Sequence, residues 1–330
     1  MTMTKTIISS VVLTIVVLLY LPSAVRPQAC SCGGAPLLSS LEVPSTPAGV
    51  WHFGLTYEFS SITKVYSGSD KLDDDVRSRR VQSGLFEINY GLTESFSISA
   101  LFTLLEQERK TISNFVTSEI VRTRGIGDGL LLLKYAVLPQ SVGNRRQLSI
   151  GGGVKIPVGQ SDIKSNNILL AADMQPGTGA WDFVLWGHAQ QGLFTKFPVT
   201  VYSTFSYRLN GTNDRFGQNT LGYKFGDELV TSLAVNFNHM TAINYNLGLR
   251  YRSTKADAFD NNDVNNSGGK WLNFVPGLNL NIYEKFGIRG EGELPLYRKL
   301  NGTQLTTSYT ISFSLFYTIA PPDKDTKFPF

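Results

Sequence analysis

The sequence contains few of the residue types from which redox, metal and nucleophilic sites are built. Its 330 residues include only two cysteines and three histidines. It also lacks the G-x-S-x-G elbow of hydrolases, the H-E-x-x-H zinc motif and the phosphate-binding G-x-x-x-x-G-K-[ST] loop. These absences argue against an enzyme, and we expect no cofactor.

Long apolar runs and a strong charge bias are missing too. After residue 25 no apolar stretch is long enough for a transmembrane helix. The net charge is only +4, from 30 basic and 26 acidic residues scattered along the chain, so no basic stripe indicates a nucleic-acid partner. The hydrophobic content of 42% still allows a large core. Without a spanning helix, a chain crosses lipid only as a closed β-barrel, because every backbone N–H and C=O must be paired internally.

Alternation of apolar and polar residues is the main positive feature of the chain. In the last such segment the apolar residues are Tyr309, Ile311, Phe313, Leu315, Tyr317 and Ile319. The residues between them include Ser308, Thr310, Ser312, Ser314 and Thr318. Side chains point to alternate faces of a strand, so this segment is apolar on one face and polar on the other. The pattern recurs from residue 50 onward, with aromatics near the strand ends, which is typical of an outer-membrane barrel.

The spacing of these segments predicts an all-β, transmembrane antiparallel barrel of twelve strands, with short periplasmic turns and long external loops in alternation. Tyr223-Lys224-Phe225 is assigned to an external loop, because a further strand would make the count odd. The predicted strands are 50–59, 81–90, 95–105, 125–137, 147–157, 181–191, 198–209, 229–237, 243–252, 271–282, 287–298 and 307–319.

The histidines do not fit a hydrolase on these strands. His52 and His188 are predicted to face the lumen, and His239 falls in a periplasmic turn. A membrane phospholipase needs its His and Ser on the lipid-facing side near the outer rim, with a carboxylate to orient the His. The predicted register therefore also favours a protein that is not an enzyme.

The ends of the chain lie outside the predicted barrel, which spans 49–320. Residues 1–29 have the positive start, apolar run and small residues of a secretory signal, with an uncleaved anchor helix as the alternative. Residues 30–48 form a periplasmic leader that is long enough to enter the lumen as a plug. Residues 321–330 form a C-terminal tail. Its final Phe330 matches the terminal aromatic of outer-membrane proteins, and we expect the barrel assembly machinery as a partner.

Cys30 and Cys32 are the two cysteines, and they follow the predicted signal. Four roles are open: lipidation of Cys30, a strained disulfide across one residue, half of a zinc or copper site, and a bridge or metal shared with another chain. A flexible leader in which neither cysteine has a chemical role is the fifth interpretation.

Several short motifs follow one another in the middle of the chain. They are Gly125-Ile126-Gly127-Asp128, Gly153-Val154-Lys155-Ile156-Pro157-Val158-Gly159, Pro176-Gly177-Thr178-Gly179-Ala180-Trp181-Asp182, Tyr207-Arg208-Leu209-Asn210-Gly211, Pro276-Gly277 and Asn301-Gly302-Thr303-Gln304-Leu305. In this order they resemble the outer-membrane family named for meta-pathway phenol degradation, over about 120–305. The resemblance implies a β-barrel transporter that is related to aromatic-hydrocarbon channels. It implies no catalytic residues.

The polar faces of the predicted strands carry acids and bases that would line the lumen. The lumen-lining candidates are Glu58, Glu87, Asp128, Lys134, Lys155, Asp182, Trp186, His188, Arg208, Arg250, Arg252, Arg289, Glu291 and Glu293. Burying such charges without partners costs several kcal/mol each, so they either pair across the lumen or line water. The first case predicts an inter-strand charge lattice that stiffens a closed barrel, and the second predicts a narrow polar conduit. Trp186 and His188, together with Phe316, form either a stacking wall for an aromatic solute or ordinary interior filling.

The sequence therefore predicts a channel or porin-like transporter in the outer membrane of a Gram-negative type of cell. It would take up small, aromatic or hydrophobic molecules passively, with membrane lipid around it; the solute and the oligomeric state are left open. The alternative is a structural or adhesive barrel that acts through its external loops, such as the acidic loop at 70–75 or the Asn-rich loop at 261–266. A plugged 22-strand transporter is excluded by chain length.

Overall fold

The architecture is taken from a computed structural model. It describes residues 43–321, except for 75, 114–116, 140–144, 194–197, 218–220, 238–242 and 284. The predicted signal segment, Cys30, Cys32, His239 and the tail from 322 onward lie outside the described residues. Among the residues described, no helix is long and apolar enough to cross a membrane.

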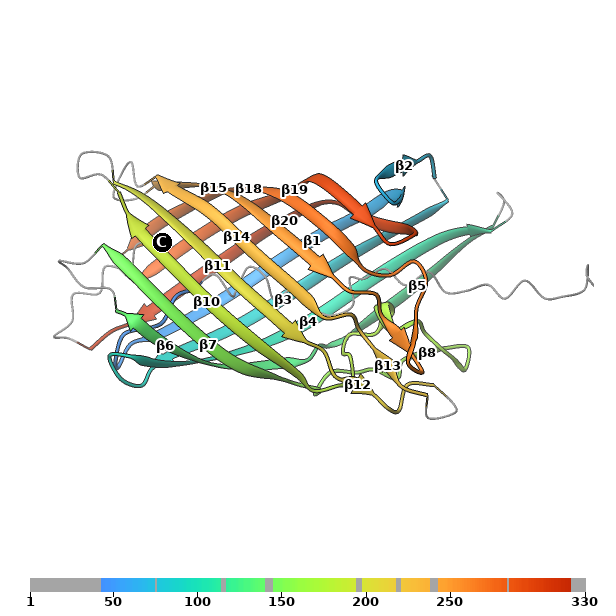
Figure 1. The fold of residues 1–330 in the computed structure, drawn as a ribbon, viewed down its shortest axis with the longest axis horizontal. Helices are drawn as coiled ribbons and strands as arrows, with labels where there is room; N and C mark the ends of the chain where they lie inside the picture. The colour runs from blue at the N-terminus through green and yellow to red at the C-terminus, as the bar shows by residue number, and fades with distance from the viewer. Residues whose placement is uncertain are drawn as a thin grey trace, which may run out of the picture.

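The described strands form a closed antiparallel barrel of 12 strands (Figure 1). Each strand pairs with the next along the chain, and β1 closes the barrel by pairing with both β20 and β3. β5 and β6 act as two halves of one wall strand, because both pair with β4 and are separated only by residues 127–128. The barrel strands are β1 (Trp51–Ser67), β3 (Arg77–Gly91), β4 (Phe96–Ser113), β5 (Thr117–Ile126), β6 (Gly129–Leu138), β7 (Arg146–Ile156), β10 (Asp182–Gly192), β11 (Val199–Leu209), β14 (Glu228–Phe237), β15 (Ile243–Thr254), β18 (Gly269–Tyr283), β19 (Phe286–Leu300) and β20 (Thr303–Ile319).

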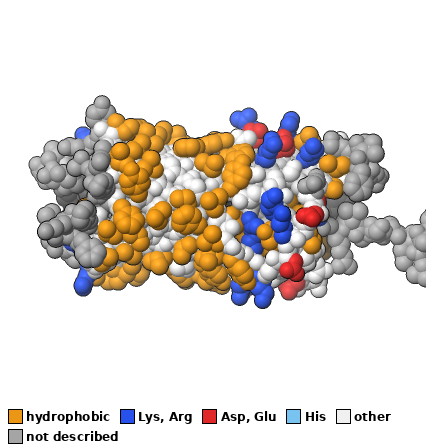
Figure 2. Space-filling view, turned by 90° about the horizontal axis from the view of Figure 1, so that it is seen from above, with side chains coloured by type: hydrophobic (Ala, Val, Ile, Leu, Met, Phe, Trp, Pro, Cys, Tyr) orange, Lys and Arg blue, Asp and Glu red, His pale blue; other side chains and the backbone are white. Residues whose placement is uncertain are grey.

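An apolar belt surrounds the barrel, because the outward member of each alternating pair is hydrophobic. Along β20, Phe313, Leu315 and Tyr317 are exposed, whereas Ser312 and Ser314 between them are buried. Figure 2 shows, on the face it presents, a broad zone of hydrophobic side chains across the middle of the barrel. Soluble proteins rarely expose so large an apolar surface to water. In a bilayer the same surface contacts the acyl chains of the lipid. The belt and the closed wall together form a membrane-spanning barrel.

The two ends of the barrel differ in the way expected for an outer-membrane protein. Short connections lie at the end where β1 begins and β20 ends, which is therefore the periplasmic end. Longer connections at the other end carry small elements of their own. These are β2 (Asp70–Leu72), β8 (Lys164–Ser165), β9 (Ile168–Leu169), the 3₁₀ turn η2 (Ala172–Met174), β12 (Thr212–Asn213), β13 (Tyr223–Lys224), β16 (Ala258–Phe259) and β17 (Asn262–Asp263).

The external connections fold together over the extracellular mouth. β12, β13, β16 and β17 form a four-stranded sheet that joins two loops distant in sequence. Tyr223 of this sheet and Phe225, which follows β13, form a small apolar cluster with Ala172 of η2. Tyr223 and Lys224 therefore form a loop strand, which confirms their assignment outside the barrel wall.

The predicted strands agree with the observed ones at the periplasmic end, and several of them are too short at the other end. Three others, 147–157, 181–191 and 198–209, agree with β7, β10 and β11 within one residue at both ends. β1 continues to Ser67, where the pattern predicts an end at residue 59, and β4 continues to Ser113, where it predicts residue 105. These extensions lie above the apolar belt. The β4 extension is polar on both faces for most of its length, and in β1 a register shift at Ile62 leaves Ile62 and Val65 buried three residues apart. The sequence therefore loses the apolar-polar alternation that marks a strand.

The described part of the leader, 43–48, lies against the inner wall near the periplasmic end. Lys134 donates from Nζ to the carbonyl of Val43 at 2.8 Å. The Ser45 hydroxyl lies 2.9 Å from that of Ser149, and the backbone N–H of Thr46 donates to Ser97 Oγ at 3.2 Å. Lys134, Ser97 and Ser149 all belong to the lumen face of the barrel, so the described leader residues occupy part of the lumen.

Candidate functional site

The inner wall of the barrel carries all fourteen of the predicted lumen candidates. Glu58, Glu87, Lys134, Lys155 and Arg250 are each less than a tenth exposed. Such burial on the polar face of a barrel means that the described interior is narrow and packed. The charges form four groups, which we describe from the extracellular end inward.

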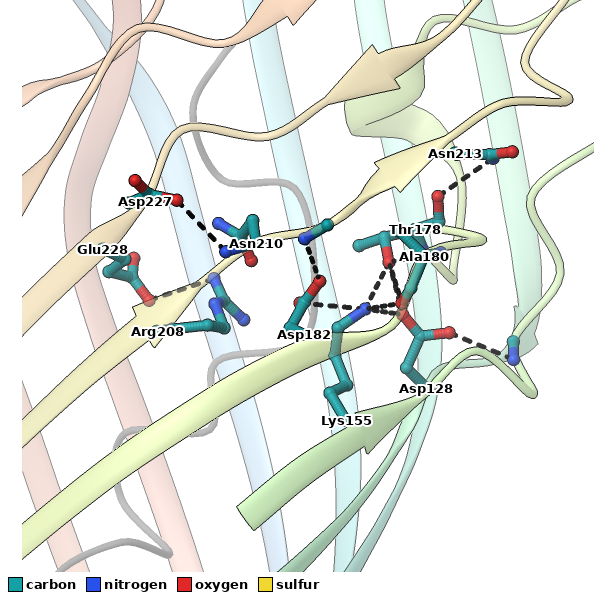
Figure 3. A network of polar contacts seen from close by, with 12 residues as sticks. Asp128, Lys155, Thr178, Ala180, Asp182, Arg208, Asn210, Asn213, Asp227 and Glu228 are labelled. Carbon is teal, nitrogen blue, oxygen red and sulfur yellow. Dashed lines mark hydrogen bonds and ion pairs between the residues drawn. The ribbon is translucent and has the colours of Figure 1, made fainter. Parts of the chain in front are cut away.

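Lys155 is the centre of the most connected group, which we call the Lys155 cluster: Asp128, Lys155, Thr178, Ala180 and Asp182 (Figure 3). The Lys155 ammonium lies 2.5 Å from Asp128 Oδ2 and 3.1 Å from Asp182 Oδ2. It also donates to the hydroxyl of Thr178 and, at 3.0 Å, to the carbonyl of Ala180. One buried cation thus holds two carboxylates from two other strands or connections.

Local register explains why these side chains meet. Lys155 on β7 lies directly opposite Asp182 on β10, so both point to the lumen. Asp128 sits in the interruption between β5 and β6, where its two oxygens accept from the backbone N–H groups of Gly159 and Thr178. Asp128 therefore ties the loop that connects β7 to β10, the 157–181 loop, to the barrel wall.

Two glycines allow the 157–181 loop to approach the wall this closely. A Cβ on Gly159 would lie 2.7 Å from backbone atoms of Gly127 and Gly177, and a Cβ on Gly177 would lie 2.6 Å from Gly159. Real Cβ atoms do not approach so closely, so only glycine fits at either position. Three of the six motifs that carry the family resemblance, at 125–128, 153–159 and 176–182, therefore converge on this one structural unit, the loop and its anchor.

A second anchor holds the tip of the same loop. Asp173 of η2 is buried and forms an ion pair with Arg79 on β3 at 3.0 Å, and a further one with Arg109 on β4. Gln107 on β4 donates to the carbonyl of Gln175 at 3.4 Å. The 157–181 loop thus crosses the mouth of the barrel from β7 to β3 and β4.

A second group of charges surrounds Glu228 on β14. Its carboxylate accepts from Arg208 on β11 at 3.0 Å and from Arg252 on β15 at 2.6 Å. The Arg252 guanidinium also lies over the ring of Trp271, 5.2 Å from its centroid. Two predicted basic residues therefore share an acid that the sequence interpretation did not single out.

A third group contains three of the six predicted acidic side chains. Arg250 lies 2.5 Å from Glu293 and donates from Nε to Ser232 at 3.3 Å. Glu58 interacts electrostatically with Arg250 and also with the carboxylates of Glu291 and Glu293. Three acids thus lie at this level of the lumen with Arg250, and Glu291 also lies 3.9 Å from Arg289.

The fourth group lies nearest the periplasmic end and combines cations with aromatic rings. Lys134 lies over Trp186, 4.7 Å from the ring centroid, and Arg289 lies over Phe316 at 5.3 Å. Glu87 interacts electrostatically with both cations. Because Lys134 and Arg289 belong to β6 and β19, this group links opposite parts of the wall.

Trp186, His188 and Phe316, which the sequence groups as one aromatic wall, lie in two separate sets of contacts. Trp186 stacks on His188 at 6.2 Å and joins an apolar cluster with Leu132. Phe316 stacks on His52 at 5.4 Å. A cation already covers a face of each ring, so these contacts support interior filling with cation–π pairs. The prediction that His52 and His188 face the lumen agrees with their burial.

Several residues of the site were missed from the sequence. Arg79 lies in a polar stretch that was assigned to a loop, and Asp173 lies in the middle of a long connection. Neither residue belongs to a periodic pattern that would predict its position. Thr178 is the one missed residue that a sequence motif indicates, because it belongs to the Pro-Gly-Thr-Gly-Ala-Trp-Asp motif. In the part of the chain that the structure describes, no three His, Cys, Asp or Glu side chains come together as a metal site.

The external sheet contains a buried acid, Asp257, whose carboxylate accepts from the Tyr223 hydroxyl at 2.7 Å and from the Gly226 N–H at 2.8 Å. Burial, with a smaller contribution from the nearby Asp173 carboxylate, raises the pKa of Asp257 from 3.8 to about 6, although the two hydrogen bonds and Arg252 oppose this effect. Asp257 therefore binds a proton more tightly in the folded protein than in the unfolded chain.

We expect the external sheet to be most protected below about pH 4 and to lose protection as pH rises to 6, with no further loss above. The size of the effect is about 3 kcal/mol at most. Hydrogen exchange of the backbone at 258–263, corrected for the intrinsic pH dependence, measures it. Asp257→Asn keeps a neutral group that can accept from Gly226 and should abolish the dependence. An unchanged pH profile in this variant would contradict the assignment.

The comparisons with known proteins agree with this architecture. No family model matches the sequence, and a search of curated protein sequences finds no match either. A solved outer membrane channel from Pseudomonas putida F1 is similar over 84% of this chain and 97% of its own, with 15% identity and a TM-score of 0.65. The transport unit of the autotransporter AIDA-I from Escherichia coli covers 86% and 95% (10% identity, TM-score 0.48), and the Ralstonia pickettii toluene transporter TbuX covers 89% and 96% (12%, 0.42). The likeness to the first of these, together with the closed wall and apolar belt, identifies the fold as an outer-membrane β-barrel, located in the outer membrane of a Gram-negative type of cell.

Proposed function

We propose that the protein is an outer-membrane channel for the passive uptake of small aromatic or hydrophobic molecules. The observation that carries the proposal is a closed barrel whose inner wall bears acids and bases from the Lys155 cluster down to Glu87 and Lys134. Rings of charged side chains at several levels are the usual means by which barrels select what passes. The solved structure with a TM-score of 0.65 is itself an outer membrane channel. The motif resemblance adds the aromatic class of solute, and neither source favours an enzyme or an adhesin.

We further propose that the channel is gated at both ends. The 157–181 loop crosses the extracellular mouth and is anchored at Asp128 and Asp173. The leader, 30–48, is the second gate, because its described residues contact the inner wall at Ser97, Lys134 and Ser149. The narrow interior is then the resting state, and solute passes when one or both segments move.

Uptake of radiolabelled toluene by Gram-negative cells tests the function. Cells that produce the chain should accumulate toluene at a higher initial rate than cells of the same strain that do not produce it. Asp128→Ala removes the carboxylate that accepts from Gly159 and Thr178 of the 157–181 loop, and it should raise the rate further. Equal rates with and without the chain, when the barrel is inserted, would contradict the proposal.

A glycine substitution should open the periplasmic gate without any deletion. A Cβ on Gly91 would lie 1.8 Å from the carbonyl oxygen of Pro47, so Gly91→Ala forces the leader away from the wall. We expect single-channel conductance to rise toward that of the chain that lacks 33–48. Gly84→Ala is the matched control on the same strand, because nothing lies within 4 Å of the added Cβ. Identical conductance in all three variants and the parent would dismiss the leader as a gate.

A further inference from the structure

The outer surface of β3, β4 and β5 changes from apolar to charged along a single line. Phe86 and Phe102 are opposite each other within the belt, and Leu104 and Ile126 form the last apolar row above them. The next outward row pairs Glu106 with Arg124. The belt therefore ends at Leu104, and charged side chains begin one row further toward the extracellular end.

The charged rows are aligned across the three strands. Arg80, Glu108 and Arg122 lie opposite one another, and the row above contains Lys110 on β4. Arg80, Lys110, Arg122 and Arg124 are exposed. The Glu108 carboxylate accepts a hydrogen bond from the Arg122 guanidinium at 2.8 Å. This contact holds both side chains over the outer surface. Four cations and two acids thus face outward on this wall, with a net positive charge.

The height of the rows matches the polar part of the outer leaflet. Successive outward rows are about 7 Å apart along a strand, and the strands are tilted. The headgroup zone of a bilayer extends roughly 5–8 Å beyond the hydrocarbon on each side. The first two charged rows therefore lie at the level of lipid headgroups, and Lys110 lies one row above them, where its long side chain can reach back toward the same level. Figure 2 shows the same change on the face it presents, where Lys and Arg side chains follow the apolar belt toward the loop end.

We propose that the surface formed by Arg80, Lys110, Arg122 and Arg124 binds the phosphate groups of lipopolysaccharide in the outer leaflet. Guanidinium groups match phosphate oxygens in geometry, and their charge is complementary to a phosphorylated glycolipid. The apolar belt directly below contacts the acyl chains of the same lipid. A free phosphate would lack this second contact, so the site binds the lipid and not the ion. The proposal is independent of whether the barrel conducts.

Native mass spectrometry of the detergent-solubilised barrel with diphosphoryl lipid A tests this surface. Each cation near an anionic surface contributes about 1 kcal/mol, so Arg80→Gln, Lys110→Gln and Arg124→Gln together should weaken binding by about 100-fold. Arg145→Gln, Arg146→Gln and Lys285→Gln form the matched control, because these exposed cations lie at the periplasmic end. The control should bind as the parent does. Heat-modifiability on gels verifies that every variant is folded.

Two comparisons make the outcome decisive. Lipid A without phosphates should bind the parent as weakly as diphosphoryl lipid A binds the triple variant. Inorganic pyrophosphate should not compete at equal concentration. Equal binding of phosphorylated and dephosphorylated lipid A, or equal loss in the triple variant and its control, would overturn the proposal; effective competition by pyrophosphate would replace it by an ion site.

Discussion

Replacing Lys155 with Met should cost about 3–5 kcal/mol of stability and should increase single-channel conductance. The substitution removes the cation that lies 2.5 Å from Asp128 and 3.1 Å from Asp182, and it leaves two buried carboxylates without compensation. The uncompensated charges gain water most easily if the 157–181 loop moves. This loop is held to the wall mainly by side-chain contacts, and its two short strands, β8 and β9, pair with each other and not with a barrel strand. We therefore expect the loop to leave the mouth of the barrel while the strands stay paired.

Two further variants separate loop release from a general loss of stability. Lys164→Met removes a cation from the same loop, but Lys164 is exposed in β8 and should have no effect on either quantity. Asp128→Asn and Asp182→Asn, added to Lys155→Met, neutralise the whole cluster and should recover most of the stability. Urea unfolding and planar-bilayer recordings measure the two effects. Parent-like stability and conductance in Lys155→Met would contradict the role of the cluster.

Replacing Arg250 with Gln should shift the ion selectivity of the channel strongly toward cations. Arg250 pairs with Glu293 and also interacts electrostatically with Glu58. Without it, the three acids at this level of the lumen retain Arg289, which lies 3.9 Å from Glu291. A unit charge about 4 Å away changes the energy of a permeating ion by up to about 4 kcal/mol near a protein surface, so a permeability ratio that changes by about tenfold is a conservative expectation.

The reversal potential in a salt gradient measures this shift, and two variants provide its controls. Glu293→Gln should move selectivity in the opposite direction, toward anions. Arg146→Gln removes an exposed cation at the periplasmic rim and should change little. If Arg250→Gln prevents insertion of the barrel, the charges form a lattice that stiffens the wall, and the conduit interpretation fails at this level.

The barrel could be predicted from the sequence because its signal is repeated in every strand. Along β20, alternation from Tyr309 to Ile319 defines both the strand and its lipid-facing side. The same register placed Lys155, Trp186 and Arg250 correctly on the inner face, where all three are buried. The pattern fixes the inward and outward faces of each strand, because a shift by one residue would exchange the two faces along the whole strand.

The partners of the inward charges could not be predicted in the same way. Whether Lys155 meets Asp182 depends on the register between β7 and β10, and that register is set by turns without a distinctive sequence. The contact between Arg79 and Asp173 depends on the path of a long loop, for which no periodicity exists. The choice between lattice and conduit is therefore a question of three-dimensional arrangement and of motion, to which the sequence alone gives no answer.

Single-channel recording of the chain that begins at residue 30, in a planar bilayer at two salt gradients, tests the central claim most directly. A gated polar conduit predicts discrete current steps whose size depends on salt concentration, with a reversal potential set by the wall charges. A barrel that is inserted and folded but electrically silent, and that stays silent in Lys155→Met and in the chain that lacks 33–48, would contradict it.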